Sequence, residues 1–562
     1  MKNTLGKKID RVTTFVPLLI ILALFFVFMV YPVQSTNILD AVRNFLGSEF
    51  GLYYIILGVG CVVISGLMAF SKYGKVKLGK IDKPAYGNFK WGTMIFTSTM
   101  AADILFYSCY EWAAYGGDPY VQHLAGGNAF DLQRWASTFP LFHWGPIAWS
   151  FYIVLAVAFG FMLHVRGRRK QKFSEACRPL LGNKVDGPIG KLIDLLAVFA
   201  LLAGTATTFS LATPLLAEAM GSIFGFTPTA VSAVIILVFI AVVYTITVLM
   251  GMKGIARLAG LCVYMFIALL LYVLIGGGET AFILEAGVSG LGNMLQNFVG
   301  LATQTDPLRT YGFVQNSTIF YWAYWMAWCV ATPFFIGMIS KGRTIKNVVL
   351  GGYGWGLAGT FTSFIILGNY GMAQQLKHGL DVSGFIRDGG AISTAIIQVF
   401  DTLPLPALGL ILLFLTMVNF YSTTFDALTM VISTYSYKEL APGEEPDKKI
   451  RTFWAVLFIL FPIALIFAKN SIDSLQSVAV IAAFPIGIIL IIILGSFYKD
   501  IRLYMRQEER AGEVRHAAGE RTDNASRTTV GGTMTCPAPE TAVGHCHRKK
   551  EEMTTASDER CF

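Results

Sequence analysis

Apolar residues in this chain gather in blocks of about twenty, separated by short polar segments. A helix of that length spans the hydrocarbon core of a bilayer, which is about 30 Å thick. The pattern therefore predicts an all-α polytopic membrane protein with about 12 transmembrane helices. The predicted spans are 14–33, 51–70, 91–115, 139–163, 191–222, 228–250, 258–277, 317–340, 347–371, 403–434, 453–469 and 474–497. The fifth and tenth spans are long enough to be tilted or broken.

Charged residues make up only 14% of the 562 residues, against 54% hydrophobic ones, which agrees with this class. The segments on either side of the spans are polar. We expect residues 1–13 to be a cytoplasmic N-terminus and residues 14–505 to form the transmembrane transporter domain. Residues 506–562 are rich in Arg, Glu, Thr and Gly and lack an apolar stripe, so a disordered cytoplasmic tail is predicted, with a charged helix at its start.

Basic residues are concentrated in alternate loops, at 71–90, 164–172, 341–346 and 448–451. The alternate loops around 35–50, 116–138 and 278–316 carry a single Arg each and no Lys. By the positive-inside rule both termini are cytoplasmic and the protein is a multi-pass protein of the cell membrane, in contact with membrane lipid. The same distribution explains the net charge of +9 without a nucleic-acid partner. Residues 279–305 are predicted to form an amphipathic helix on the outer surface.

The stretch FYWAYWMAW places aromatic residues inside a predicted span. Tyr321, Tyr324, Trp325 and Trp328 follow one another at helical spacing and share one face. Aromatic belts lie at the membrane interface, whereas the last two of these residues lie well within the span. The alternative is an ordinary packing or lipid-facing aromatic surface. Because Pro333 follows closely, the helix can deviate where the cluster ends.

A second aromatic cluster, FHWGPIAWSFY at 142–152, lies in the fourth span. Two indole-bearing helices that face each other form an aromatic box. The π faces of such a box attract a weakly hydrated cation, each contact contributing about 0.5–2 kcal/mol. A quaternary ammonium has no N–H group that would lose a hydrogen bond there. The two clusters therefore point to a small-molecule trimethylammonium substrate.

The motifs HWGxxAWxxY (143–152) and FYWAxW followed by SKGRT (320–344) resemble the betaine/carnitine/choline transporter family. Further similarity runs through LATP (211–214) and TDP (305–307), and the resemblance covers roughly residues 10 to 505. It implies two inverted five-helix repeats, spans 3–7 and 8–12, which work by alternating access around a substrate near the midplane. It also implies a homotrimer, no catalytic residues and no cofactor beyond a coupling ion.

Carried over position by position, the resemblance assigns aromatic substrate-binding residues. The central box would be Trp144, Trp149, Tyr152 and Trp325, and the residues further along the pathway Trp322, Tyr324 and Trp328. Tyr324 departs from the usual tryptophan, and its phenol adds a hydroxyl to the π face.

The third span departs further from the family, because it has no glycine where many members have a glycine-rich run. Asp103 stands there instead, and an ionisable group at membrane depth is a functional candidate. It could attract the cationic head, titrate in proton coupling, or reach a substrate hydroxyl; the alternative is a satisfied structural residue. Glu111, on the same span, is expected to satisfy backbone groups at a helix break.

The resemblance also implies a candidate sodium site between the third and tenth spans. Its residues would be Thr97, Met100, Phe420, Thr423 and Thr424, with Thr207 and Thr208 as weaker candidates for a second cation site. Hydroxyl and carbonyl oxygens are the ligands that sodium prefers, although packing threonines are also common in membrane helices. Sodium-free exchangers of the family carry a basic residue in the seventh span, where this chain has Cys262.

The sequence thus predicts a secondary active transporter that takes up glycine betaine, choline, carnitine or γ-butyrobetaine, coupled to sodium first and to a proton second. An exchanger of the same family without ion coupling is the alternative. Two hypotheses come from other functional classes: a sensor that binds a quaternary amine, and a membrane-embedded enzyme. The enzyme is disfavoured because His143, the one histidine well inside a span, has no paired base in its motif.

Overall fold

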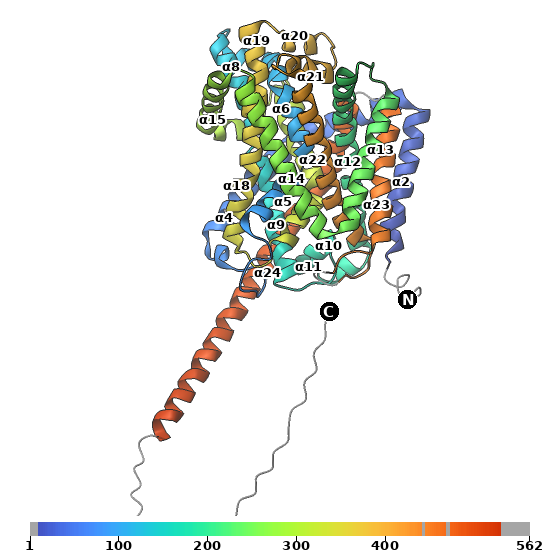
Figure 1. Cartoon of the computed structure of the whole chain (residues 1–562). Coiled ribbons are helices and arrows are strands. Elements are labelled where there is room, and N and C mark those ends of the chain that lie inside the picture. Colours follow the sequence, from blue (N-terminus) through green and yellow to red (C-terminus); the bar gives the residue numbers. More distant parts are fainter. Residues whose placement is uncertain (1–8, 100, 441–443, 468–471, 530–562) are drawn as a thin grey trace, which may run out of the picture. The chain divides into compact units, whose positions relative to one another are not determined.

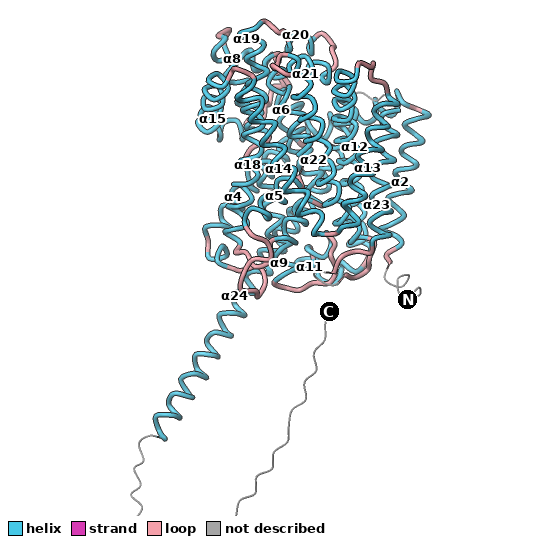
Figure 2. Tube along the Cα trace, in the orientation of Figure 1, coloured by secondary structure: helices cyan, strands magenta, loops and turns pink. Residues whose placement is uncertain are grey.

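The computed structural model describes residues 9–99, 101–440, 444–467 and 472–529. In these residues the chain is helical almost throughout and contains no strand, only two isolated β-bridges (Figure 2). The predicted all-α class is confirmed. Eight helices of the described part are long and apolar enough to cross a membrane, and a ninth span results if one bent pair counts as a single crossing.

Each predicted span coincides with a helix or a series of helices (Figure 1). Spans one to six are α2 (Arg11–Val30), α4 (Gly51–Phe70), α5 (Asn88–Thr97) with α6 (Ala101–Gly116), α8 (Ala129–His143) with α9 (Pro146–His164), α12 (Pro188–Phe224) and α13 (Ala230–Met250). Spans seven to twelve are α14 (Met252–Leu271) with η3 (Tyr272–Gly276), η4 (Val314–Thr318) with α16 (Ile319–Ala327), η5 (Trp328–Val330) and α17 (Thr332–Ile339), α18 (Ile345–Ser363) with η6 (Phe364–Gly368) and α19 (Asn369–His378), α22 (Pro406–Tyr435), α23 (Lys448–Phe467) and α24 (Ile472–Thr529).

Shorter elements connect the spans. They are α3 (Pro32–Glu49), η1 (Lys72–Lys75), α7 (Pro119–Ala125), α10 (Phe173–Ala176), α11 (Arg178–Leu181), η2 (Gly182–Asp186), α15 (Thr280–Thr303), α20 (Val382–Arg387) and α21 (Ile392–Asp401). A helix is present at the predicted amphipathic segment 279–305, as α15, but its exposed positions include the large apolar residues Leu284, Val288, Leu295 and Val299, while Asn293 is buried.

The third and eighth spans contain helix breaks, and α8 and α9 of the fourth span are separated at Trp144 and Gly145. The third span is interrupted between α5 and α6, and the two parts of the eighth are bent by 52°. The fifth and tenth spans, which their length marked as tilted or broken, are instead continuous helices of 37 and 30 residues. Breaks that recur five spans apart agree with two repeats whose first helix is discontinuous.

Neighbouring helices stabilise the break in the third span, although that span has no glycine there. The Thr332 hydroxyl, at the start of α17, donates to the Ser98 carbonyl over 3.1 Å. Thr424 on α22 donates to the Thr97 and Thr99 carbonyls over 3.0 and 2.8 Å. The carbonyls released by the break therefore have partners on the eighth and tenth spans, as buried backbone groups require.

The helix α9 lies at the centre of the bundle. Every residue from Ile147 to Leu163 is buried. The helix approaches α17 where Gly160 meets Gly337: a Cβ on the second glycine would lie 2.7 Å from the backbone nitrogen of the first. Glycine is needed at position 337 for this crossing, which places the fourth span directly against the eighth.

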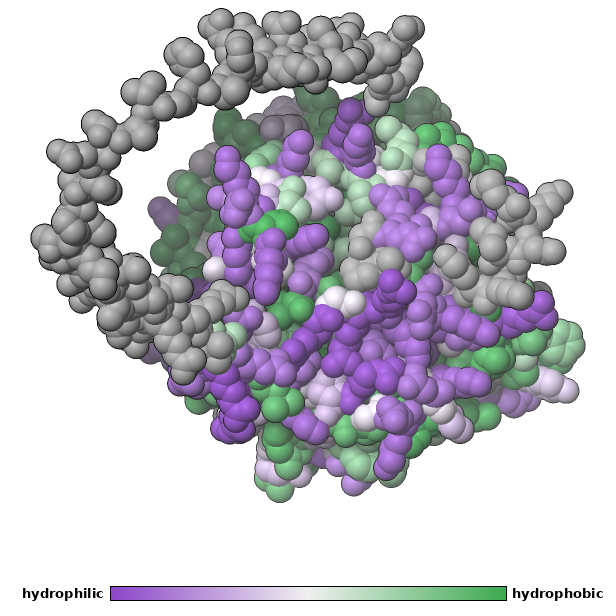
Figure 3. All heavy atoms as spheres, turned by 90° about the horizontal axis from the view of Figure 1, so that it is seen from below, coloured by the Kyte–Doolittle hydropathy of each residue, from purple (hydrophilic) through white to green (hydrophobic). Residues whose placement is uncertain are grey.

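The two ends of the bundle differ in charge. The loops 71–90, 164–172 and 341–346 lie at one end, called here the basic end, and Figure 3 shows hydrophilic side chains gathered across it. On this end Arg178 bridges two acids, with Nε 2.7 Å from Glu175 and Nη2 2.9 Å from Asp186. The opposite end carries α15, α19, α20 and α21 (Figure 1), and α7 packs against α8.

The helix α24 extends to Thr529, well past the start of the tail predicted to be disordered from residue 506. The reason is local: residues 502–529 are rich in Arg, Glu and Ala, which all favour helix in exposed positions. Residues 530–562 lie outside the described residues.

Candidate functional site

The four predicted box residues lie together in the interior of the bundle. Trp144, Trp149 and Tyr152 come from the fourth span, and Trp325 from α16 in the eighth. The Trp325 ring centroid is 5.7, 5.3 and 4.8 Å from the centroids of those three rings, in the same order. All four side chains are fully buried.

The box rings touch one another, and this limits how a ligand enters. A cation held by two ring faces lies within about 6 Å of each centroid and between them. Trp325 is in direct contact with its three neighbours, so a trimethylammonium group fits only after Trp325 moves away from α9. The helical segment that carries it ends at Ala327, and the bend that follows offers the place for that movement.

The indole nitrogens divide the tryptophans into two groups. Trp144 Nε1 donates to Glu111 Oε2 over 2.9 Å, and Trp149 Nε1 donates to Thr360 Oγ1 over 3.1 Å. Trp149 also lies flat against Gly356, where a Cβ would come within 2.5 Å of the ring. The tryptophans of the fourth span are thus held in place. The indole nitrogens of the eighth-span residues Trp322, Trp325 and Trp328 are buried without a hydrogen-bond partner among the described residues.

The other aromatic residues of the eighth span face different neighbours. Trp322 packs against Phe142, at 6.0 Å between centroids, and against Gly58 of α4. Trp328 lies against Gly204 of α12. The structure therefore does not bring these two tryptophans into the box.

Tyr324 and Asp103, two departures from the family pattern, are partners in the structure. The Tyr324 hydroxyl donates to Asp103 Oδ2 over 2.8 Å. The Thr208 hydroxyl donates to the same oxygen over 2.8 Å and lies 2.7 Å from the tyrosine oxygen. The sequence held a signal for this pair, since a new hydroxyl and a new carboxyl at membrane depth satisfy each other.

The second oxygen of Asp103 is left over. Oδ1 is buried and has no hydrogen-bond partner in the described part of the chain, and no described Lys or Arg forms an ion pair with this carboxyl group. The group is itself fully buried. Burying a carboxyl oxygen without a hydrogen-bond partner costs free energy, and a ligand that contacts this oxygen recovers part of that cost. Asp103 Oδ1 is therefore a candidate contact for a ligand.

The candidate sodium residues also converge. Thr423 donates to the Thr97 and Phe420 carbonyls over 3.2 and 3.0 Å, and Thr424 approaches the same break in the third span. It is the Thr97 carbonyl that both of these threonines contact, whereas the Thr97 hydroxyl donates to the Thr93 carbonyl over 2.9 Å. The site is a set of hydroxyl and carbonyl oxygens without a carboxylate, which suits a monovalent hard cation.

Of three further candidate residues for cation binding, the structure describes the side chain of one. Thr208 belongs to the Asp103 cluster described above and not to a separate oxygen cluster. Met100 lies outside the described residues, and so does the side chain of Thr207.

Glu111 has partners that the sequence did not reveal. It was expected to satisfy backbone groups at a helix break, but its oxygens accept from the side chains of Tyr115 and Trp144. The Tyr115 oxygen lies 2.6 Å from His143 Nδ1, and His143 Nε2 lies 2.9 Å from the Thr318 hydroxyl. The expectation for Glu111 was wrong because the break is stabilised by threonines of other spans, which leaves Glu111 free to accept from side chains.

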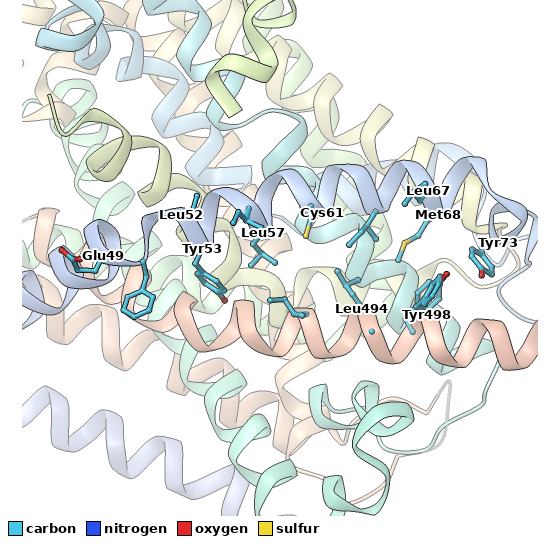
Figure 4. Close-up of a pocket in the computed structure, with 17 residues that line it drawn as sticks. Glu49, Leu52, Tyr53, Leu57, Cys61, Leu67, Met68, Tyr73, Leu494 and Tyr498 are labelled. Carbon is cyan, nitrogen blue, oxygen red and sulfur yellow. The ribbon is translucent and has the colours of Figure 1, made fainter. Parts of the chain in front are cut away.

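A groove of about 920 Å³ lies away from this site, between α4 and α24 (Figure 4). The described residues that line it are mostly aliphatic and aromatic, and Glu49 at one end is the only charged one among them. The groove lacks the convergent polar groups of a solute site. The box is therefore the better candidate for substrate binding.

Comparison with known proteins agrees with this geometry. The family model described as "BCCT, betaine/carnitine/choline family transporter" matches residues 12–506. The "Carnitine transporter" of Acinetobacter baumannii is 27% identical over 84% of this chain and 86% of its own length. The "Probable glycine betaine transporter" of Desulfitobacterium hafniense is 30% identical over 84% of this chain and 93% of its own. The "Glycine betaine transporter OpuD" of Bacillus subtilis is 27% identical, over 86% and 93%.

The matched region contains every span, the box and the oxygen cluster at the helix break. The similarity extends over most of each relative, so it concerns the whole transmembrane unit and not one motif. The chain belongs to the betaine/carnitine/choline family of transporters, and it is not an enzyme.

Proposed function

We propose that the protein takes up a quaternary-ammonium compound by alternating access, with sodium as the main coupling ion. The observation that carries the proposal is the box itself: Trp144, Trp149 and Tyr152 surround Trp325 in a fully buried cluster. Such faces favour a cation without N–H groups. Two of the relatives are named for glycine betaine and one for carnitine, which supports the same substrate class.

Asp103 favours substrates with a net positive charge within this class. Its unpartnered oxygen lies in the same buried interior as the box, and Tyr324, the neighbour of Trp325, holds its other oxygen. A carboxylate there attracts choline and opposes the carboxylate of a betaine. We therefore propose that choline is preferred over glycine betaine.

The orientation follows the charge difference between the ends. The basic end faces the cytoplasm by the positive-inside rule, which places both termini inside and the end with α15 and α20 outside. Substrate then enters from the outer end along α16, which precedes the eighth-span bend, and the movement of Trp325 admits it to the box.

The proposal is tested with the purified protein in proteoliposomes. Uptake of choline, glycine betaine, carnitine and γ-butyrobetaine is measured under an imposed sodium gradient, a proton gradient, both and neither. Accumulation of at least one of the four against its gradient, driven by sodium, supports the proposal. Exchange of internal for external substrate with no dependence on either ion would contradict the coupling, and absence of uptake of all four would contradict the substrate class.

Replacing Thr424 with Val tests the sodium site. The substitution keeps the shape but removes the hydroxyl that reaches the Thr97 and Thr99 carbonyls. We expect the sodium concentration for half-maximal uptake to rise about tenfold, since one oxygen ligand of roughly 1.4 kcal/mol is lost. Uptake as a function of sodium concentration is the measurement.

Two matched variants accompany this test. Thr424→Ser keeps the hydroxyl and is expected to retain sodium dependence. Thr416→Val removes a buried hydroxyl from the same helix, away from the break, and is expected to leave it unchanged. An unaltered sodium response in Thr424→Val would show that the ion binds elsewhere.

A further inference from the structure

A chain of four polar side chains runs through the buried half of the bundle next to the box. It joins Glu111 and Tyr115 on α6, His143 at the end of α8, and Thr318 in η4. The successive distances are 2.7 Å from Glu111 Oε1 to the Tyr115 oxygen, 2.6 Å from that oxygen to His143 Nδ1, and 2.9 Å from His143 Nε2 to Thr318 Oγ1. All four residues are buried.

The hydrogens of this chain can be arranged in two complete ways. With Glu111 ionised, Thr318 donates to His143 Nε2, His143 Nδ1–H donates to Tyr115, and Tyr115 donates to Glu111. With Glu111 protonated, every donor and acceptor exchanges roles: the acid donates to Tyr115, Tyr115 to His143 Nδ1, and His143 Nε2–H to Thr318. The imidazole is neutral in both arrangements and changes only its tautomer. The two arrangements keep the three hydrogen bonds that join these four side chains and differ by one proton. The Tyr321 hydroxyl, which also interacts with Glu111 and Tyr115, lies beside the chain and not between its members.

We propose that this chain is a proton wire that loads Glu111, so that the protein binds a proton as well as its substrate; this rests on the proposed transport function. A proton arriving at Thr318 Oγ1 displaces the hydroxyl proton to His143 Nε2. The Nδ1 proton passes to Tyr115, and the Tyr115 proton passes to Glu111 Oε1. One proton enters at Thr318 and one proton is bound at Glu111, with no other change in charge.

One end of the wire lies near an exposed residue of the eighth span, and the other end contacts the aromatic box. Thr318 follows exposed Asn316 and half-buried Ser317, at the end of the eighth span away from the basic loops. At the other end, Glu111 Oε2 accepts the indole N–H of Trp144, a ring of the box. A hydrogen bond to a carboxylate is about twice as strong as one to a neutral acid. Protonation of Glu111 therefore loosens a wall of the box, which links the proton to the substrate.

The surroundings of Glu111 support a titrating role. Its titratable neighbours are Tyr110 and Tyr115 on α6, His143 on α8, and Tyr321 on α16. Within the described residues no Lys or Arg forms an ion pair with it, so no fixed positive charge holds the group ionised. A carboxyl group of purely structural function would gain from such a partner at this depth.

The test uses the full-length protein in proteoliposomes with an internal pH-sensitive dye, and choline and glycine betaine as probes. Glu111→Gln keeps an acceptor for Trp144 but cannot bind the proton. We expect substrate-driven proton influx to fall to background in this variant, while binding of the probes stays measurable. Tyr115→Phe interrupts the wire but leaves the contact between Glu111 and Trp144, and we expect the same loss of proton influx.

The matched control is Glu218→Gln, which neutralises a half-buried acid on α12 outside the wire. It is expected to retain wild-type proton influx. Proton influx that persists in both Glu111→Gln and Tyr115→Phe overturns the proposal. Uptake of a probe by the wild type without proton movement also overturns it, although the proposed transport function then still holds. Wild-type protein that takes up neither probe contradicts the transport function instead.

A measurement without substrate tests the wire even if the wild-type protein takes up neither probe. Infrared difference spectra recorded between high and low pH should show a protonated carboxyl band that disappears in Glu111→Gln and shifts in Tyr115→Phe. Identical spectra for the wild type and Glu111→Gln overturn the wire.

Discussion

Trp325→Ala is expected to abolish measurable uptake at micromolar substrate. Trp325 contacts Trp144, Trp149 and Tyr152, so its removal takes away one face of the box and the packing that aligns the others. Loss of two or more cation–π contacts corresponds to roughly 1–3 kcal/mol, which weakens binding by about 5- to 150-fold. Binding of choline and glycine betaine to the purified protein, by calorimetry, measures the loss directly.

Two variants separate a lost π face from a lost side chain. Trp325→Phe keeps an aromatic ring and should recover part of the affinity. Trp328→Phe alters a tryptophan that lies against Gly204 outside the box, and should affect affinity less. Unchanged affinity for every quaternary amine in Trp325→Ala would exclude the box as the binding site.

Asp103→Asn is expected to reverse the order of preference between choline and glycine betaine. Asparagine retains the shape and can still accept from Tyr324 or Thr208, but the negative charge is gone. Two unit charges about 8 Å apart at an effective dielectric constant of about 20 interact by on the order of 2 kcal/mol. Choline loses this attraction and the carboxylate of betaine is relieved of repulsion. The ratio of affinities should therefore shift by roughly 10- to 100-fold.

Competition of the two unlabelled compounds against labelled choline measures that ratio. Tyr324→Phe is the matched control, because it removes one donor to Asp103 and keeps the carboxyl group. Its ratio should stay close to that of the wild type. A parallel decrease for both compounds in Asp103→Asn would show that the residue supports the structure and does not select substrates.

The composition of the site was largely predictable, whereas its connections were not. The helical spacing of Tyr321 to Trp328 and the motif at 143–152 named the ring residues, and the structure brings four of them together. Spacing along one helix says which residues share a face, but not which neighbouring helix that face meets. Trp322 and Trp328 illustrate the limit, since they share the motif and contact α4 and α12 instead.

The hydrogen-bond partners in the site were even harder to predict from the sequence than the contacts between aromatic rings. Glu111, His143 and Thr318 are separated by 32 and 175 positions in the chain, and nothing in the sequence around them indicates that they form one network. The pairing of Tyr324 with Asp103 was indicated only indirectly, because both depart from the family pattern. A buried polar residue shows that a hydrogen-bond partner is required, but it does not identify that partner.

Hydrophobic block length and loop charge were sufficient to predict the helical class, the positions of the spans and the basic end. These properties depend on local composition, because a bilayer requires every span to satisfy its own backbone hydrogen bonds. The position of the breaks was only partly readable from the sequence. Pro333 indicated the bend of the eighth span, which the structure confirms. Length, however, suggested breaks in the fifth and tenth spans, which are continuous, whereas the third span breaks where Thr332 and Thr424 supply partners for its released carbonyls. A broken helix is stable only where other helices satisfy its open backbone groups, and that information lies between segments far apart in the sequence.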